Sequence, residues 1–237
     1  MSERTTFAVA VLVLVLIAVG LLAADQVNLL PALAATRATE VDRLFRMLVG
    51  IATVIFLIVE GGLVYAVLRF RRRKGDDAEG VAYHGNNALE LVWTLIPAIL
   101  VVVVGFSSYR SLARIERPDQ NPMVVEVVGR QFTWLFLYPQ EGLTTSELHV
   151  PLGQPVRLEL TSEDVIHSFW VPNFLAKRDA TPGRVSELLF TASQLGTFPI
   201  RCAELCGAGH AIMTSQVVVH TPDDFEAWMA AQVEASD

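Results

Sequence analysis

Hydrophobic residues are distributed unevenly along the chain, with three long apolar stretches in its first half, at residues 7–22, 47–68 and 91–106. The second stretch is long enough to cross a membrane as a helix, although Glu60 interrupts it. The third contains Pro97, which membrane helices tolerate better than soluble ones. The pattern therefore predicts a two-helix transmembrane hairpin over residues 41–112, surrounded by lipid.

The first apolar stretch has two interpretations. It carries no charge, it follows a short head that contains Arg4, and the small residues Ala23 and Ala24 come after it. These features fit a cleaved signal peptide and a retained anchor helix alike. Residues 1–24 are therefore predicted to be one or the other.

The orientation of the hairpin follows from a cluster of positive charge. Residues 69–74 carry five Lys or Arg side chains directly after the second apolar stretch. Such clusters remain in the cytoplasm, so the bend at residues 75–87 is expected there. The chain after Tyr109 then emerges on the outer face of the membrane.

From Met123 onward the hydrophobic pattern changes to short β-rich segments separated by glycine and proline. The segments are residues 123–128, 132–138, 156–160, 167–171, 185–190, 197–202 and 216–220. Several short strands at this spacing predict a β-sandwich or small barrel over residues 120–222. Thr221 and Pro222 then begin a short amphipathic helix over residues 223–237.

Composition and charge narrow the class of protein. Hydrophobic residues make up 52% of the 237 residues, which is too apolar for an ordinary soluble domain. From Gln120 onward six Lys or Arg stand against fourteen Asp or Glu, a net charge of −8. This part of the chain repels nucleic acid and attracts basic partners, so a nucleic-acid function is excluded.

The chemistry of the chain is concentrated between Cys202 and Met213. This segment contains both cysteines of the protein, together with His210. Thiolate and thioether are soft ligands and imidazole is intermediate, a mixture that suits copper. Two glycines between Cys206 and His210 let the backbone fold tightly around a centre.

The two cysteines have three other interpretations. They could form a disulfide, because an exported domain is in an oxidising compartment. They could bind zinc with His210, but a structural zinc site has no use for Met213. They could be buried free thiols, which are uncommon outside the cytoplasm. Because Cys202, Cys206, His210 and Met213 all fall in one segment, copper is favoured.

A copper centre in this segment needs a further nitrogen ligand from elsewhere in the chain. His84 is excluded by its expected cytoplasmic position, and His149 and His220 have neighbours typical of strand ends. His167 begins a predicted strand after a polar turn. A lone histidine on an apolar strand is more often structural, so His167 is a candidate only because the segment needs a ligand.

Taken together, these segments resemble subunit II of haem–copper cytochrome c oxidase over residues 41–220. The copper motif C-x-E-x-C-x-x-x-H-x-x-M runs without a gap from Cys202 to Met213. Three further segments match the family in order: LELVWTLIP at 89–97, HSFWVP at 167–172 and KRDATPGR at 177–184. The resemblance implies that residues 120–222 form a cupredoxin-like Greek-key barrel.

The resemblance also implies a dinuclear copper centre and the role of each ligand. Cys202 and Cys206 would bridge two copper ions. His167 and Met213 would complete the coordination of one ion, and His210 and the backbone carbonyl of Glu204 that of the other.

Two carboxylates also acquire roles from the resemblance. The Glu204 side chain would help to bind magnesium at the interface with subunit I. Glu90 would lie at the entrance of a proton pathway into subunit I, and an ionisable group at a membrane helix is a functional candidate by default.

The chain departs from the family where electrons enter. The family typically has Q-W-x-W, whereas residues 131–134 read QFTW, so Phe132 replaces the first tryptophan. Phe132 and Trp134 are the candidates for electron entry. The stretches at 57–61 and 71–77 look most like cyanobacterial members, in which small soluble carriers reduce the enzyme.

The expected protein is therefore a cytochrome c oxidase subunit in a prokaryotic plasma membrane or a thylakoid, with its copper domain on the outer, periplasmic or lumenal face. It accepts electrons from a soluble c-type cytochrome or similar carrier and passes them to haem in subunit I, where oxygen is reduced to water. Two alternatives are the copper subunit of a nitric-oxide reductase and a membrane-tethered copper chaperone. The chaperone interpretation predicts exposed, exchangeable ligands.

Overall fold

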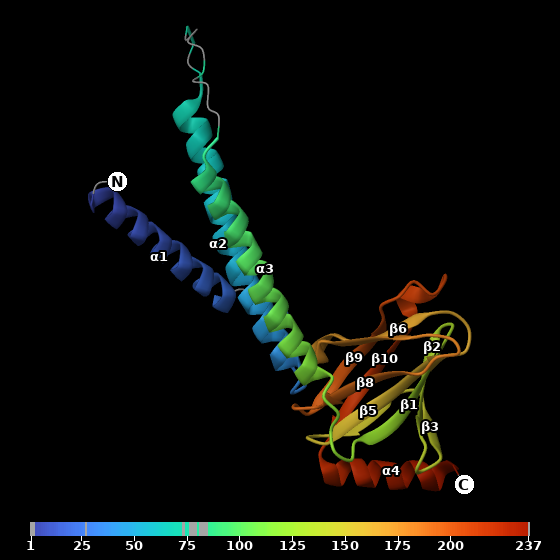
Figure 1. The fold of residues 1–237 in the computed structure, drawn as a ribbon. Helices are drawn as coiled ribbons and strands as arrows, with labels where there is room; N and C mark the ends of the chain where they lie inside the picture. The colour runs from blue at the N-terminus through green and yellow to red at the C-terminus, as the bar shows by residue number, and fades with distance from the viewer. Residues whose placement is uncertain (1–2, 27, 73, 76–79, 81–84, 237) are drawn as a thin grey trace. The chain divides into compact units, whose positions relative to one another are not determined.

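The computed structural model describes residues 3–26, 28–72, 74–75, 80 and 85–236, and the chain forms two compact units (Figure 1). The first unit comprises Met1–Leu29 and Arg43–Ser111. The second unit comprises Leu30–Asp42 and Leu112–Asp237. The first unit is helical and the second is built mainly of β-strands.

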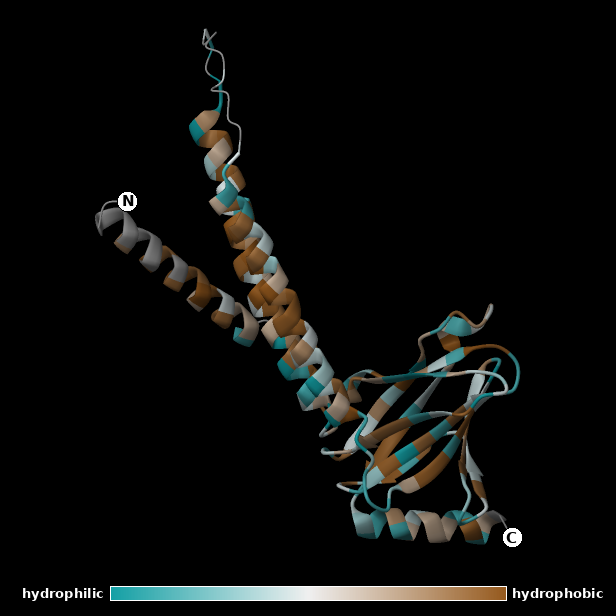
Figure 2. Cartoon of the chain, viewed as in Figure 1, coloured by the Kyte–Doolittle hydropathy of each residue, from teal (hydrophilic) through white to brown (hydrophobic). Residues whose placement is uncertain are grey.

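In the described residues, the first unit contains α1 (Glu3–Gln26) and most of α2 (Ala38–Phe70) and α3 (Asn87–Ile115). Helices α2 and α3 are long and apolar enough to cross a membrane, and hydrophobic residues run along both (Figure 2). Pro97 lies inside α3 without ending it. The predicted hairpin is confirmed, while residues 76–79 and 81–84 of its bend, including His84, lie outside the described residues.

The strands of the second unit form two five-stranded sheets. The first sheet has the order β3 (Leu143–Thr145), β2 (Thr133–Tyr138), β1 (Met123–Arg130), β5 (Pro155–Ser162), β8 (Ser186–Thr191). The second has the order β4 (Leu148–Pro151), β10 (Thr214–His220), β9 (Gly196–Cys202), β6 (His167–Val171), β7 (Ala176–Ala180). Most neighbouring strands are antiparallel, but β1 with β5 and β4 with β10 are parallel pairs.

Aromatic side chains from both sheets meet in the core of the second unit. The ring of Phe169 on β6 meets those of Trp134 and Phe136 on β2 edge-to-face, with centroids 5.5 Å and 6.3 Å apart. Burial alternates strictly along β5, as expected for a strand with one face on the core. The two sheets therefore pack as a sandwich, and the predicted cupredoxin-like all-β domain is confirmed.

All seven predicted strands are present, and the structure adds β3, β4 and β7. Each of the added strands lies at an edge of its sheet. Edge strands pair on one side only and carry polar or charged residues that discourage further pairing. In β7 three of the five residues are Lys177, Arg178 and Asp179, so no apolar alternation reveals this strand in the sequence.

Residues 30–42 also pack on the β-rich unit, which the hydrophobic pattern did not predict. Ala34 and Ala35 are buried, and the Ala34 N–H donates to the Asn173 carbonyl at 2.8 Å. The Arg37 guanidinium pairs with the Asp119 carboxylate at 2.5 Å. At the other end of the unit, the predicted C-terminal helix is α4 (Pro222–Ser236), and its Trp228 ring stacks on His149 at 3.9 Å.

Candidate metal centre

Pairing of three strands brings the distant candidate ligands together. His167 is the first residue of β6, Cys202 is the last residue of β9, and Met213 directly precedes β10. Phe169 lies opposite Cys202 in the β6–β9 pair, so the start of β6 lies beside the end of β9. The Cys202 N–H donates to the Met213 carbonyl at 3.1 Å, which closes the loop between β9 and β10.

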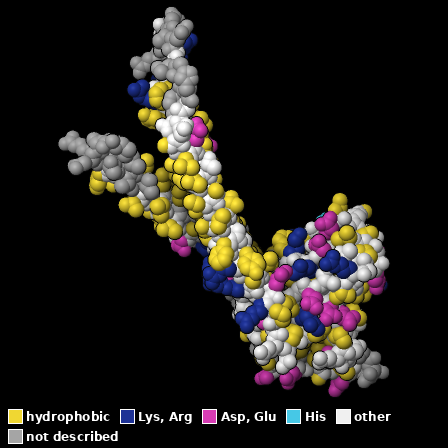
Figure 3. All heavy atoms as spheres, viewed as in Figure 1, with side chains coloured by type: hydrophobic (Ala, Val, Ile, Leu, Met, Phe, Trp, Pro, Cys, Tyr) yellow, Lys and Arg dark blue, Asp and Glu magenta, His cyan; other side chains and the backbone are white. Residues whose placement is uncertain are grey.

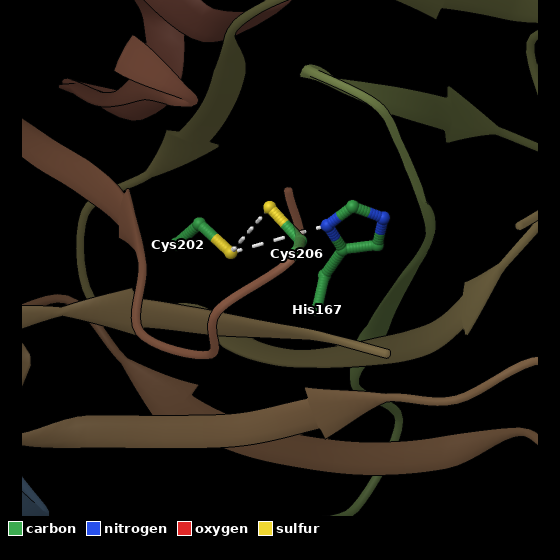
Figure 4. Close-up of side chains that lie close together, drawn as sticks. All are labelled: His167, Cys202 and Cys206. Atoms are coloured by element: carbon green, nitrogen blue, oxygen red, sulfur yellow. Dashed lines mark hydrogen bonds between the residues drawn. The ribbon is translucent and has the colours of Figure 1, made fainter. Parts of the chain in front are cut away.

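The two cysteine sulfurs and the His167 ring form the centre of the cluster (Figure 4). The Sγ atoms of Cys202 and Cys206 are 3.8 Å apart, and Cys202 Sγ is 3.9 Å from His167 Nδ1. A disulfide has its sulfurs about 2.05 Å apart, so the two thiols are free. Among the described residues these three form the single group of His, Cys and acidic side chains close enough to share a metal ion.

The other predicted ligands surround this group. His210 Nδ1 and Met213 Sδ lie 3.7 Å and 3.8 Å from Cys206 Sγ. The backbone carbonyl oxygen of Glu204 lies 3.2 Å from Cys202 Sγ. The structure therefore brings all six predicted donors to one place, and the donor set is two thiols, two imidazoles, one thioether and one carbonyl.

The sulfur ligands are shielded from water. Met213 and His167 are completely buried, and Cys202 and Cys206 are 8% and 4% exposed. Burial and the neighbouring Cys202 sulfur raise the pKa of the Cys206 thiol to about 11. A bound cation would reverse this by favouring the thiolate, because metal binding displaces protons from thiol ligands. The donor set and its burial fit a soft metal such as copper.

Asp164 orients the His167 ring. Its Oδ1 lies 2.8 Å from His167 Nε2, which leaves His167 Nδ1 facing the sulfurs. The same carboxylate accepts the N–H groups of Gln131 at 2.7 Å and Val165 at 2.6 Å. Burial alone would raise the pKa of Asp164, but these hydrogen bonds outweigh it and hold the pKa well below its usual range. A carboxylate behind a ligand histidine fixes the tautomer and strengthens the ligand.

The two candidates for electron entry take different positions. Trp134 is completely buried, and its ring meets His167 edge-to-face at 5.9 Å. Phe132 is partly buried and lies directly against the loop, because a Cβ added to Gly209 would lie 2.4 Å from its ring. The glycines of the motif are thus needed for close approach to Phe132 as well as for a tight turn.

The remaining candidates lie outside this cluster. Glu90 is in the first turn of α3, and the Glu204 side chain is exposed. His149 and His220 lie on β4 and β10, where His149 Nδ1 is 2.8 Å from His220 Nε2. Their expected place on strands is confirmed, and neither belongs to the cluster of His167, Cys202 and Cys206.

Sequence reasoning missed two residues that support the centre. Asp164 holds His167, and the side-chain amide of Gln131 donates to the Cys206 carbonyl at 2.6 Å. Asp164 lies three residues before His167 in a polar turn, a spacing that could have marked it as the partner of the ligand. Gln131 had no comparable signal, because its contact spans 75 residues of sequence.

Comparison with known proteins identifies relatives of the whole chain. The family model for the periplasmic domain of cytochrome c oxidase subunit II matches residues 143–221, and that for its transmembrane domain matches residues 23–111. Cytochrome c oxidase subunit 2 of Synechocystis sp. is 37% identical over 88% of this chain and 77% of its own length. The subunit 2 protein of Thermostichus vulcanus is 36% identical over 85% of this chain and 77% of its own.

Solved structures give matches to the β-rich part. The crystal structure of the periplasmic domain of cytochrome oxidase subunit II from Bradyrhizobium japonicum is 30% identical, with a TM-score of 0.47. The match covers 50% of this chain and 97% of that structure.

Proposed function

The chain belongs to the cytochrome c oxidase subunit II family, and from this premise we propose that the six clustered donors bind a dinuclear copper centre that receives electrons for the oxidase. The observation that carries the proposal is the packing of three further donors around the two cysteine sulfurs. His167 Nδ1 lies 3.9 Å from Cys202 Sγ, and His210 Nδ1 and Met213 Sδ lie 3.7 Å and 3.8 Å from Cys206 Sγ. Oxygen is reduced elsewhere in the complex, in subunit I.

The distances show which donor lies nearest to each of the two sulfurs. Cys202 Sγ lies near His167 and the Glu204 carbonyl, while Cys206 Sγ lies near His210 and Met213. The two imidazoles thus approach different sulfurs. A sulfur that bridges two metals is close to both, so the division proposed from the family is kept: His167 and Met213 would complete one ion, and His210 and the Glu204 carbonyl the other. Cys202 and Cys206 would hold the copper centre through their thiolates, and the centre would supply one-electron transfer with little change in bond lengths.

The residues around the ligands keep the centre rigid. The hydrogen bonds from Cys202 N–H to Met213 and from Ala203 N–H to Ser168, at 3.1 Å and 2.8 Å, hold both ends of the loop. Asp164 fixes the His167 ring. A rigid ligand shell suits electron transfer because the protein does not rearrange when the charge of the centre changes.

Electrons are proposed to reach the centre across the side of the loop that Phe132 covers. Its ring contacts the Cys206–His210 segment, whereas Trp134 is completely buried and serves as core packing beside His167. The net charge of −8 on the outer half favours a basic soluble carrier, such as a c-type cytochrome. Charged and apolar side chains are intermingled on the face of the β-rich unit shown in Figure 3.

Three further assignments rest on the family and on charge. The helix bend lies in the cytoplasm and the copper domain on the outer face, in agreement with the five positive charges at residues 69–74. Glu90 then lies at the cytoplasmic end of α3, where it serves a proton pathway into subunit I. The exposed Glu204 side chain is free to bind magnesium at the interface with subunit I.

The copper-chaperone alternative does not fit the burial of the site. It predicts exposed and exchangeable ligands, but His167 and Met213 are completely buried and both cysteines are nearly so. The copper subunit of a nitric-oxide reductase would use the same centre. Co-purification with an oxygen-reducing subunit I separates these two enzymes.

The copper content of the purified subunit tests the proposal directly. We expect two copper ions per chain and an EPR spectrum in which one unpaired electron couples equally to both. One copper per chain with a single-centre hyperfine pattern would contradict the dinuclear assignment.

A second measurement tests the bridge. Cys206→Ser removes one bridging sulfur, so we expect the shared-electron spectrum to disappear. Ala208→Ser is the matched control, because it introduces the same hydroxyl at an exposed position of the same loop. Survival of the shared-electron signal in Cys206→Ser would show that the bridge is assigned to the wrong residues.

A further inference from the structure

We infer that α1 remains in the mature protein as a third membrane helix, packed against α2 through a close crossing at Gly20 and Gly50. The sequence left residues 1–24 open between a cleaved signal peptide and a retained anchor. The contacts within the helical unit favour the anchor. The region matched by the transmembrane-domain family begins at residue 23, so nearly all of α1 precedes it.

The first observation is the fit of the two glycines at the crossing. A Cβ added to Gly20 would lie 2.6 Å from Val54 Cγ2 and 2.9 Å from the Gly50 carbonyl oxygen. A Cβ added to Gly50 would lie 3.3 Å from the Gly20 carbonyl oxygen. A side chain at position 20 would therefore have to displace Val54 or the backbone of α2, whereas one at position 50 would need only a small adjustment. Close approach of backbones at small residues is how membrane helices commonly pack.

The close contact is specific to this crossing. A Cβ on Gly61, further along α2, would meet nothing within 4 Å, and the same holds for Gly105 on α3. Glycine is thus not needed for packing in these helices at large. Gly20 is also the one residue of α1 that is buried among those whose side chains are described.

The second observation is independent of the glycines. Arg46 of α2 donates from Nη1 to the backbone carbonyls of Ala24 at 3.2 Å and Asp25 at 3.0 Å. These carbonyls lie in the last turn of α1, where no helical N–H remains to pair with them. A guanidinium group there satisfies the carbonyls and complements the negative end of the helix dipole.

Through these two contacts α1 packs specifically against α2. Without α1, the Gly50 surface of α2 would be left uncovered, and Arg46 would lose both of these carbonyl acceptors. A segment removed after export has no need of a fitted crossing or of a cap on its C-terminal turn. The partner of this helix surface is therefore α2 of the same chain.

The mass of the subunit in the purified oxidase tests retention. Intact-mass spectrometry and N-terminal sequencing of a C-terminally tagged subunit should find residues of α1 at its amino end. A mature chain that begins near Asp25 would overturn the inference. The result does not depend on copper, so it is separate from the test of the proposed function.

A cysteine pair tests the packing itself. An ideal Cβ at position 50 lies 3.5 Å from Ala24 Cβ, within the Cβ–Cβ range of about 3.5–4.5 Å that a disulfide requires. We expect Ala24→Cys with Gly50→Cys to cross-link in membranes under mild oxidation. Ala24→Cys with Gly61→Cys is the control and should stay reduced. A retained α1 whose 24–50 pair cross-links no more than the control would overturn the crossing.

Discussion

Replacing Asp164 with Asn tests whether the copper site depends on residues behind its ligands. The carboxylate receives three N–H groups: Gln131 N–H on Oδ2, and Val165 N–H and the His167 ring on Oδ1. An amide of the same shape has only one oxygen. If that oxygen takes the Oδ1 position, the new NH₂ group faces the Gln131 N–H, and two donors oppose each other.

The magnitude follows from two considerations. An unsatisfied buried donor costs about 1–3 kcal/mol, but the Gln131 contact is exposed and water reduces this cost. Loss of the partner behind a ligand histidine typically lowers metal affinity about 10–100-fold, which corresponds to about 1.4–2.8 kcal/mol. We therefore expect Asp164→Asn to weaken copper binding by one to two orders of magnitude (roughly 10–100-fold) while all six ligands remain.

Competition with a chelator of known copper affinity measures this change. Glu163→Gln is the matched control, because it removes one negative charge at the adjacent exposed position and leaves the His167 contact in place. The control should retain the affinity of the unmodified protein. Equal copper affinities for Asp164→Asn and Glu163→Gln would refute the role assigned to Asp164.

Three further predictions concern Met213, Gly209 and His149. Met213→Leu nearly preserves the volume of a completely buried side chain, so the free energy of unfolding should change by less than about 1.5 kcal/mol. The EPR spectrum should change. An unchanged spectrum would remove Met213 from the ligand set. Gly209→Ala places a Cβ 2.4 Å from the Phe132 ring and should displace that ring. We expect slower reduction by a soluble carrier at unchanged copper content, measured by stopped-flow absorbance. Ala208→Ser, in the same loop, should leave the rate unchanged. Burial and the neighbouring His220 lower the pKa of His149 from 6.5 to about 4, so the unfolded chain takes up a proton first as the pH falls. Thermal stability of the detergent-solubilised chain should therefore drop between pH 6.5 and about 4, His149→Gln should reduce this drop, and an equal drop in the variant would contradict the assignment.

Much of the fold was predictable because the relevant signals are local in sequence. A membrane-spanning helix is an apolar run of sufficient length, and a half-buried strand is a short alternation between turn residues. The hairpin, the seven core strands and the C-terminal helix all carry these signals. Three of the four edge strands, β3, β4 and β7, do not, because a strand paired on one side can be short or charged.

The candidate metal site was likewise predictable only in part. The sequence by itself determined that Cys202, Cys206, His210 and Met213 lie together, because one loop carries all four, and their chemistry predicts copper. The family resemblance pointed to His167, but only the tertiary structure shows that it, and neither His149 nor His220, lies beside the cysteine sulfurs, since this depends on the pairing of β6 with β9. The roles of Asp164 and Phe132, and the packing of Gly20 on Gly50, were likewise decided only in three dimensions. Each is a contact between segments distant in the chain or a matter of side-chain direction, and a linear pattern of residue types does not encode which distant backbones approach each other.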